Sequence, residues 1–169
     1  MIVAVAWAKL NGLISEDTVW YQQKWTRGTT FENDKAKLIW DFEYNLRKTT
    51  TARRPDLVLE NKTNKIIWIC DMACPQSINV EKKRIEKINK YRQLAFESRE
   101  RRTNYKVYIV PLIIGAMGGG VKALANDVKK LFDKKEDGLV TEIVATIQKT
   151  VLMDSESILR RVMSGLIQE

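Results

Sequence analysis

Runs of hydrophobic residues predict three consecutive strands in the first half of the chain. From residue 37 to 46, large apolar side chains recur at every second position from Trp40 onward, as on a half-buried strand. A second strand is expected over residues 55–60, and the polar residues 61–64 (NKTN) form a turn into a third strand over residues 65–74. Because the third run is apolar almost without a break, it predicts a strand covered on both faces.

Amphipathic spacing predicts helices at the start of the chain, in the middle and throughout the last third. The first is short and apolar, and Asn11-Gly12 ends it. The longest is highly charged and spans 24 residues. The expected helices cover residues 2–10, 79–102, about 121–135, 139–152 and 155–168.

The apolar run at residues 107–114 predicts another interior strand, although Pro111 cannot donate to a ladder. Since the long helix joins the strand at 65–74 to this one, the two strands should be parallel. Residues 18–25 have a mixed pattern that allows one more strand. The sequence therefore predicts one α/β domain over residues 1–169, with a mixed sheet, flanking helices and a helical C-terminal third.

Charge and composition narrow the classes of function. The chain has 29 Lys and Arg against 21 Asp and Glu, a net charge of +8, which favours nucleic acid as a partner over an anionic membrane. It has no histidine, which excludes His-based catalysis and zinc sites that need imidazole. Residues 1–10 are too short to span a bilayer and lack the basic start of a secretory signal. An intracellular protein without a membrane partner is expected.

The two cysteines are expected to be buried and reduced. Cys70 and Cys74 lie four residues apart in a predicted strand, which separates them by roughly 13 Å. A disulfide needs Cα atoms within about 7 Å.

Two acidic residues suggest a metal site. Asp71 interrupts an apolar strand, where an unpaired carboxylate is costly unless a cation, hydrogen bonds or a solvent-exposed strand end stabilises it. Asp56 begins the preceding strand, so the predicted hairpin brings both acids to the same end of the sheet. Two carboxylates there suit Mg²⁺ or Mn²⁺, which support phosphodiester displacement. The alternative for Asp71 is a polar residue that merely ends its strand.

The order Arg54-Pro55-Asp56, Asp71, Lys87 and Tyr91 resembles the PD-(D/E)XK nuclease superfamily. It is most similar to the restriction-like endonuclease domain of non-LTR retrotransposon reverse transcriptases, and the stretches LIWDFE, KINKYRQL and VPLIIGAMG extend the likeness.

This resemblance implies a restriction-endonuclease-like core at about residues 1–120, followed by C-terminal helices at about 121–168. It implies a nuclear, Mg²⁺- or Mn²⁺-dependent endonuclease that nicks DNA for retrotransposon integration. The partners would then be DNA, with RNA–DNA intermediates as a further candidate, and a reverse transcriptase module of a longer protein.

One departure concerns the lysine that the superfamily places two residues after the second acid, where this chain has Ala73. A helical wheel directs Lys87 toward the sheet, so we expect Lys87 to substitute, or Lys90 if the wheel is rotated by one position. The competing interpretation of Lys87 is a solvated side chain at the edge of the core.

Other charged residues have weaker expected roles. Asp41 is a candidate third metal ligand, although a salt bridge at the core edge is the competing role. Arg53, Arg54 and Lys83 are candidate contacts to a phosphate backbone. Two functions stay open: a metal-dependent endonuclease, and a catalytically inactive module with the nuclease fold that binds nucleic acid or protein.

Overall fold

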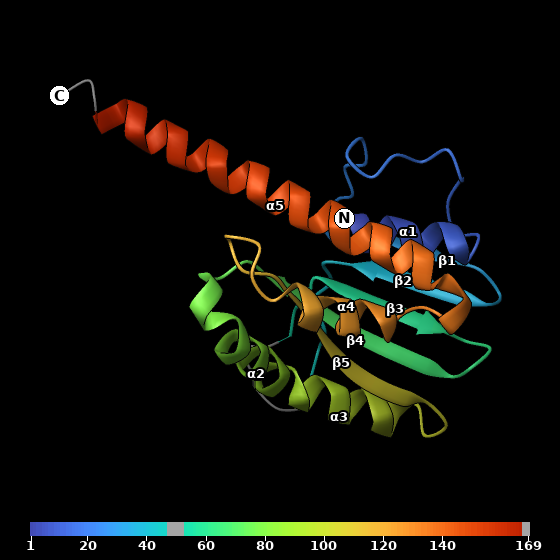
Figure 1. Cartoon of the computed structure of the whole chain (residues 1–169). Coiled ribbons are helices and arrows are strands. Elements are labelled where there is room, and N and C mark those ends of the chain that lie inside the picture. Colours follow the sequence, from blue (N-terminus) through green and yellow to red (C-terminus); the bar gives the residue numbers. More distant parts are fainter. Residues whose placement is uncertain (47–52, 167–169) are drawn as a thin grey trace.

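A five-stranded mixed sheet flanked by helices forms the body of the protein in a computed structural model, which describes residues 1–46 and 53–166 (Figure 1). Strand order in the sheet follows chain order; β1 to β4 are antiparallel neighbours, and β5 runs parallel to β4. The expected mixed α/β architecture is confirmed. The elements are α1 (Ile2–Leu10), β1 (Thr30–Glu32), β2 (Ala36–Trp40), β3 (Leu57–Asn61), β4 (Ile66–Ala73), η1 (Ser77–Asn79), α2 (Val80–Lys90), α3 (Arg92–Arg101), β5 (Lys106–Ile113), α4 (Val121–Lys129), η2 (Lys134–Glu136) and α5 (Asp137–Leu166).

The hairpin of β3 and β4 confirms the predicted pairing of these strands. Its polar turn is held by the Asn61 side chain, which accepts a hydrogen bond from the Asn64 N–H at 2.8 Å. Lys65 completes the turn with a φ of 54°. Strand β4 has buried side chains on both faces, as its continuous apolar run predicts.

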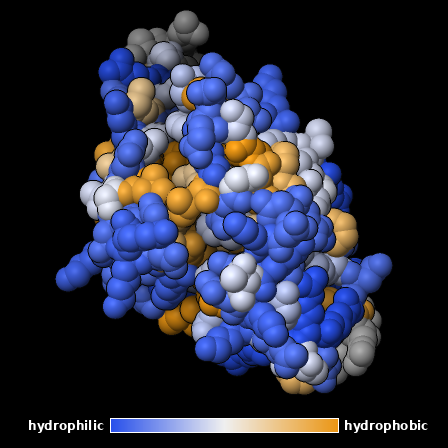
Figure 2. Space-filling model, turned by 90° about the vertical axis from the view of Figure 1, so that its right-hand side faces the viewer, coloured by the Kyte–Doolittle hydropathy of each residue, from blue (hydrophilic) through white to orange (hydrophobic). Residues whose placement is uncertain are grey.

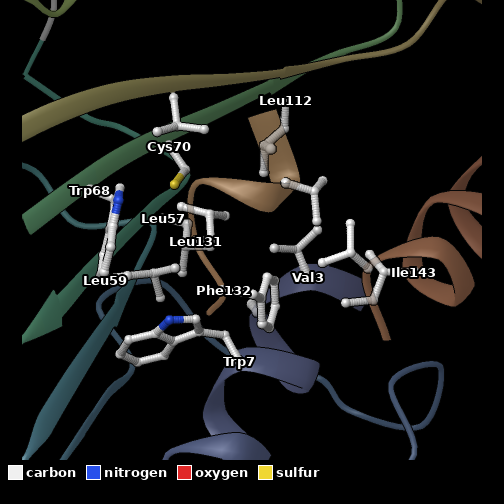
Figure 3. Close-up of a cluster of buried hydrophobic side chains, with 14 of the residues drawn as sticks. Val3, Trp7, Leu57, Leu59, Trp68, Cys70, Leu112, Leu131, Phe132 and Ile143 are labelled. Atoms are coloured by element: carbon white, nitrogen blue, oxygen red, sulfur yellow. The ribbon is translucent and has the colours of Figure 1, made fainter. Parts of the chain in front are cut away.

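The sheet separates two hydrophobic cores. The larger core lies between the sheet and helices α1, α4 and α5, where Trp7 meets Trp68 edge to face with ring centroids 6.5 Å apart (Figure 3). The smaller core lies under α3 and includes Val58, Ile69 and Leu94. Because side chains alternate along a strand, Cys70 faces the larger core while its neighbour Ile69 faces the smaller one.

The crossover from β4 to β5 consists of two helices rather than the single predicted helix over residues 79–102. The break lies at Tyr91, whose φ and ψ of −98° and 7° leave the helical range and whose side chain is fully buried. Val80, the first residue of α2, contacts the start of α4. There Gly120 has a φ of 83°, and an added Cβ would lie 2.8 Å from Val80 Cγ1. Only glycine therefore allows α4 to begin this close to α2.

Strand β5 lies at the edge of the sheet, so the prediction of an interior position in the strand order is wrong. Its parallel pairing with β4 is confirmed. Pro111 is compatible with the observed position, because a strand at the edge has one side whose N–H groups need no partner strand. Helices α2, α3 and α4 nevertheless contact the strand, which explains its apolar sequence.

Several predicted boundaries are wrong for local reasons. Residues 18–25 form no strand, and the strand predicted over residues 37–46 ends at Trp40, because Asp41 adopts a φ of 48°. The short strand β1 was not predicted. The helix predicted at about 121–135 ends at Lys129.

The two helices predicted over residues 139–152 and 155–168 form one helix, α5, which extends well beyond the body of the protein (Figure 1). The hydroxyl of Ser155 does not begin a new helix; it donates to the Ala116 carbonyl oxygen at 2.8 Å. No helix within the described ranges is long and apolar enough to cross a membrane. The face of the molecule in Figure 2 is mainly hydrophilic, with a hydrophobic strip across it.

Candidate functional site

The β3–β4 hairpin places Asp56 and Asp71 beside each other. Leu57 pairs with Cys70, so the residues one step further, Asp56 and Asp71, are the next opposed pair across the hairpin. Opposed residues of antiparallel strands share a face, and here it is the face covered by α2 and α3. Oδ2 of Asp56 accepts a hydrogen bond at 2.7 Å from the N–H of Met72, which follows Asp71. The structure therefore brings the two predicted carboxylates together.

Asp71 is buried, with 3% of its surface exposed, and its two oxygens have different environments. Oδ1 accepts a hydrogen bond from the Tyr91 hydroxyl at 2.7 Å. Oδ2 is buried and has no hydrogen-bond partner among the described residues. The cation nearest to Oδ2 is Lys87 Nζ, which forms an ion pair with it, and Lys90 Nζ lies 4.0 Å from Oδ1.

Tyr91 connects the site to the backbone leading into β3. Its hydroxyl, which has a single proton, lies 2.7 Å from Asp71 Oδ1 and 2.8 Å from the Arg54 carbonyl oxygen. Burial first, and then the hydrogen bond to Asp71, raise the pKa of Tyr91 far above its usual range. The phenol thus stays protonated and positions the carboxylate.

Asp56 has a raised pKa. Burial is the largest cause, and the charge of Asp71 adds to it. The hydrogen bond from Met72 N–H and the charges of Lys87 and Lys90 lower the pKa and partly offset these effects. A second carboxylate beside a buried one makes the pair favour an added cation.

The donor set fits a small, hard cation. Asp56 Oδ1 accepts no hydrogen bond from the described residues, and Asp71 Oδ2 is the buried oxygen without one. Carboxylate oxygens suit Mg²⁺ and Mn²⁺, and Mg²⁺ is commonly bound through one or two carboxylates with water completing the shell.

Asp41, the predicted third ligand, is not part of this pair. Both of its oxygens accept hydrogen bonds from the guanidinium of Arg54, which lowers the pKa of Asp41. In the described part of the chain, no three Asp, Glu, Cys or His side chains form a group that could hold a metal. The competing expectation, a salt bridge at the core edge, is what the structure shows.

The predicted phosphate contacts lie on the surface in ion pairs. Arg53 Nε is 4.0 Å from Glu43 Oε1, Arg54 pairs with Asp41, and Lys83 Nζ is 2.8 Å from Glu86 Oε1. Exposed pairs of this kind contribute little to stability, so a phosphate can replace the carboxylate at small cost.

An open hollow of about 370 Å³ lies where β4 ends, beyond Asp71 in the chain, and neither carboxylate lines it. Ala73 and Cys74 at the end of β4 form one side, and Lys82 and Lys83 of α2 contribute to the other. Both cysteines are free, as predicted, but Cys74 is exposed, so the expectation that both are buried is wrong.

Two groups of the site were missed because they belong to the backbone. The Met72 N–H holds Asp56, and the Arg54 carbonyl oxygen accepts from Tyr91. Every residue has such groups, so no residue type could indicate them.

Comparison of the chain with protein-family models, curated proteins and solved structures finds no match. The chemistry of the site therefore has to be inferred from its geometry, which places two carboxylates on one face of the sheet with two lysines beside them.

Proposed function

We propose that this chain is a DNA endonuclease that depends on a divalent metal, with Asp56 and Asp71 as metal ligands and Lys87 as the assisting cation. One observation carries the proposal: Asp71 is buried beside Asp56 on one face of the sheet, with one oxygen lacking a hydrogen bond. Two adjacent carboxylates that have lost part of their hydration are costly, and a metal would compensate for the part of that cost that the ion pair of Lys87 with Asp71 does not.

The order of elements also supports a restriction-endonuclease-like fold. Apart from the additional short strand β1, helix α1 is followed by the antiparallel strands β2, β3 and β4, then by the crossover helices, and then by the parallel strand β5. The resemblance of the sequence to PD-(D/E)XK nucleases implies this order. The candidate carboxylates lie at the end of the hairpin that the resemblance assigns to them.

Mg²⁺ or Mn²⁺ bound there would polarise a phosphate and lower the pKa of a bound water. Asp56 is held by the Met72 N–H, and Tyr91 fixes the orientation of Asp71. Lys87, with its side chain only 13% exposed, places a positive charge where it can offset charge on the phosphate or orient the attacking water.

DNA is the proposed substrate because of the chain's charge. A net charge of +8 favours binding to a polyanion, with an affinity that falls as the salt concentration rises, because counterions released into a more concentrated solution gain less free energy. The hollow between the end of β4 and α2 has Lys82 and Lys83 in its lining, which suits the backbone of a nucleic acid.

A second candidate is a catalytically inactive module that keeps the fold and binds nucleic acid or protein. The direct ion pair between Lys87 and Asp71 supports it, because the lysine already balances the carboxylate without a metal. Ala73, in place of the usual lysine, points the same way.

Nicking of supercoiled plasmid by the purified protein distinguishes the two candidates. We expect nicking with Mg²⁺ or Mn²⁺, none with EDTA, and none for Asp56→Asn or Asp71→Asn. Asp133→Asn, an exposed acid far along the chain, is the matched control and should retain activity. Salt-dependent DNA binding without nicking under either metal would favour the inactive module.

A further inference from the structure

The Asp71 oxygen that is best suited to a metal already has a cation against it. Lys87 Nζ forms an ion pair with Asp71 Oδ2, the oxygen that no hydrogen bond from the described residues reaches. Both partners are enclosed, since the Lys87 side chain is 13% exposed and that of Asp71 is 3% exposed. Because Oδ2 is buried, a metal ion can reach it only if a neighbouring side chain moves.

Lys87 is the neighbour that is free to move. The ring of Tyr91 is fully buried, and its hydroxyl lies between Asp71 Oδ1 and the Arg54 carbonyl oxygen, so Tyr91 is fixed in place. Within residues 1–46 and 53–166, the Lys87 ammonium has no hydrogen bond and no ion pair other than the one with Asp71. Its long, flexible stem allows it to leave the carboxylate without any change in the backbone.

The charges around the two carboxylates balance without a metal. Asp56 and Asp71 bring two negative charges, and Lys87 and Lys90 bring two positive charges, with Lys90 Nζ 4.0 Å from Asp71 Oδ1. Both ammonium groups also lower the pKa of Asp56, so their charge acts on both carboxylates. A divalent ion added to this balanced group leaves two excess positive charges in a partly buried place, which is costly. The cost falls if a lysine withdraws or an anion arrives.

A phosphodiester of DNA meets both conditions. Its negative charge offsets part of the excess, and its oxygens accept hydrogen bonds from an ammonium as the oxygens of a carboxylate do. Transfer of Lys87 from Asp71 Oδ2 to a phosphate oxygen opens Oδ2 and keeps the ammonium paired.

On the basis of the function proposed above, we propose that Lys87 holds the metal position of the free protein and releases it to a phosphodiester, so that divalent metal and DNA bind cooperatively. Metal binding by the free protein is then weak. By thermodynamic linkage, the factor by which DNA tightens metal binding equals the factor by which metal tightens DNA binding. The ion pair therefore restricts the metal-loaded site to chains that have bound a nucleic acid.

Titration of the full chain with Mn²⁺, followed by the electron paramagnetic resonance signal of the free ion, tests whether Lys87 holds the metal position. We expect Lys87→Met to bind Mn²⁺ about tenfold more tightly than wild type or better, because the variant has the stem without the charge. Lys87→Arg keeps the positive charge and should bind Mn²⁺ as weakly as wild type. Unchanged or weaker binding by Lys87→Met would overturn the proposal.

Two other lysines provide matched controls for the loss of one charge. Lys90→Met removes a charge close to the carboxylates but not at Oδ2, so its gain in Mn²⁺ affinity should be much smaller. Lys149→Met removes an exposed charge from α5, which packs against the opposite face of the sheet, and should bind Mn²⁺ like wild type. Equal gains for Lys87→Met and Lys90→Met would overturn the proposal, because net charge alone would then explain them.

The effect of DNA is measured on wild type, so it does not depend on any variant being folded. A duplex with a phosphorothioate backbone keeps its negative charges and resists cleavage, and the Mn²⁺ bound by the duplex alone is subtracted. We expect this duplex to tighten Mn²⁺ binding to wild type by about tenfold, and to have a smaller effect on Lys87→Met. Equal Mn²⁺ affinity of wild type with and without the duplex would overturn the cooperativity.

These titrations separate the role of Lys87 from the proposed nuclease function. If wild type nicks plasmid but binds Mn²⁺ as tightly as Lys87→Met, only the role of Lys87 in the free protein is overturned. If neither wild type nor any variant binds Mn²⁺, with or without DNA, the metal site itself is overturned, and the proposed function with it.

Discussion

Asp71 and Asp127 are both buried carboxylates that face α2, yet their surroundings differ. Asp127 is fully buried and accepts hydrogen bonds from Arg84 and from Lys130, the latter at 2.7 Å. Both of its oxygens are used. Asp71 accepts one hydrogen bond, leaves Oδ2 without any, and has Asp56 beside it.

The comparison shows that burial of an acid alone does not indicate a binding site. The pair at Asp127 joins α4 to α2 and is complete without a ligand. The pair at Asp71 combines two carboxylates, an oxygen that lacks a hydrogen bond and two nearby lysines. We expect the second arrangement, and not the first, to bind an added cation.

The largest expected effect is on stability at Asp127. We expect Asp127→Asn to lower the free energy of unfolding by about 3–5 kcal/mol, because it removes the buried partner of Arg84 and leaves only the exposed Glu81, 3.6 Å away. Asp71→Asn should cost less, since Lys87 keeps the neighbouring charge of Asp56 and asparagine can still accept from Tyr91. Urea unfolding of both variants and of the exposed control Asp133→Asn measures this. A larger loss at Asp71 would break the comparison.

The next effect is on catalysis. Lys87→Ala should slow plasmid nicking by roughly 100-fold or more, as the loss of other electrostatic stabilisers does. DNA affinity should barely change, because one charge among 29 basic residues contributes little. Lys83→Ala, in the same helix but paired with Glu86, should retain the nicking rate. Single-turnover rates at saturating protein measure the effect.

Lys90→Ala tests whether Lys87 or Lys90 is the assisting lysine. Its ammonium is 4.0 Å from Asp71 Oδ1 and stacks on the Tyr91 ring, so we expect a small loss of rate. A larger loss for Lys90→Ala than for Lys87→Ala would transfer the assisting role to Lys90. Full nicking by both variants would contradict a role for a helix lysine.

Metal binding should appear as a thermal shift. At a concentration ten times the dissociation constant, Mn²⁺ or Mg²⁺ should stabilise the protein by about 1.4 kcal/mol, or about 3–6 °C for a domain of this size. Asp56→Asn should remove the shift. Asp127→Asn should lower the melting temperature of the metal-free protein but keep the metal-induced shift, because the hydrogen bonds of that carboxylate are already complete. Loss of the shift in Asp127→Asn together with its retention in Asp56→Asn would contradict the assignment of Asp56 as a metal ligand.

The smallest effect is a pH dependence at Asp56 in the absence of metal. Burial raises the pKa of Asp56 above its ordinary value of 3.8. The raised pKa contributes stability that is present below pH 3.8 and lost as the pH rises through the folded pKa. Asp56→Asn should therefore gain stability relative to wild type between acid and neutral pH. Unfolding of wild type and Asp56→Asn in EDTA, at one acid and one neutral pH, measures the difference. If the variant is no more stable than wild type at neutral pH, the raised pKa is contradicted.

The hairpin and its two acids could be predicted from sequence because their signals are local. A continuous apolar run, a polar turn and one charge inside the run give both the pairing of β3 with β4 and the face of Asp71. The wheel also placed Lys87 toward the sheet, where the structure pairs it with Asp71.

Other features depend on tertiary contacts that no local pattern reports. The break at Tyr91 follows from the burial of its ring and from the acceptors of its hydroxyl, which come from two distant segments. The pairing of Asp41 with Arg54 required knowing where β2 ends. The position of β5 at the edge of the sheet could not be predicted either, because helices on both faces give this strand the composition of an interior strand.

The proline in β5 bears on the aggregation of newly synthesised chains. An eight-residue strand with an open edge and the sequence KVYIVPLI can recruit other chains into cross-β aggregates, above all before the helices dock. Pro111 deprives that strand of one N–H and interrupts any continuous ladder with a neighbour. We therefore expect Pro111 to oppose edge-to-edge pairing of newly made chains while the native parallel pair with β4 stays intact.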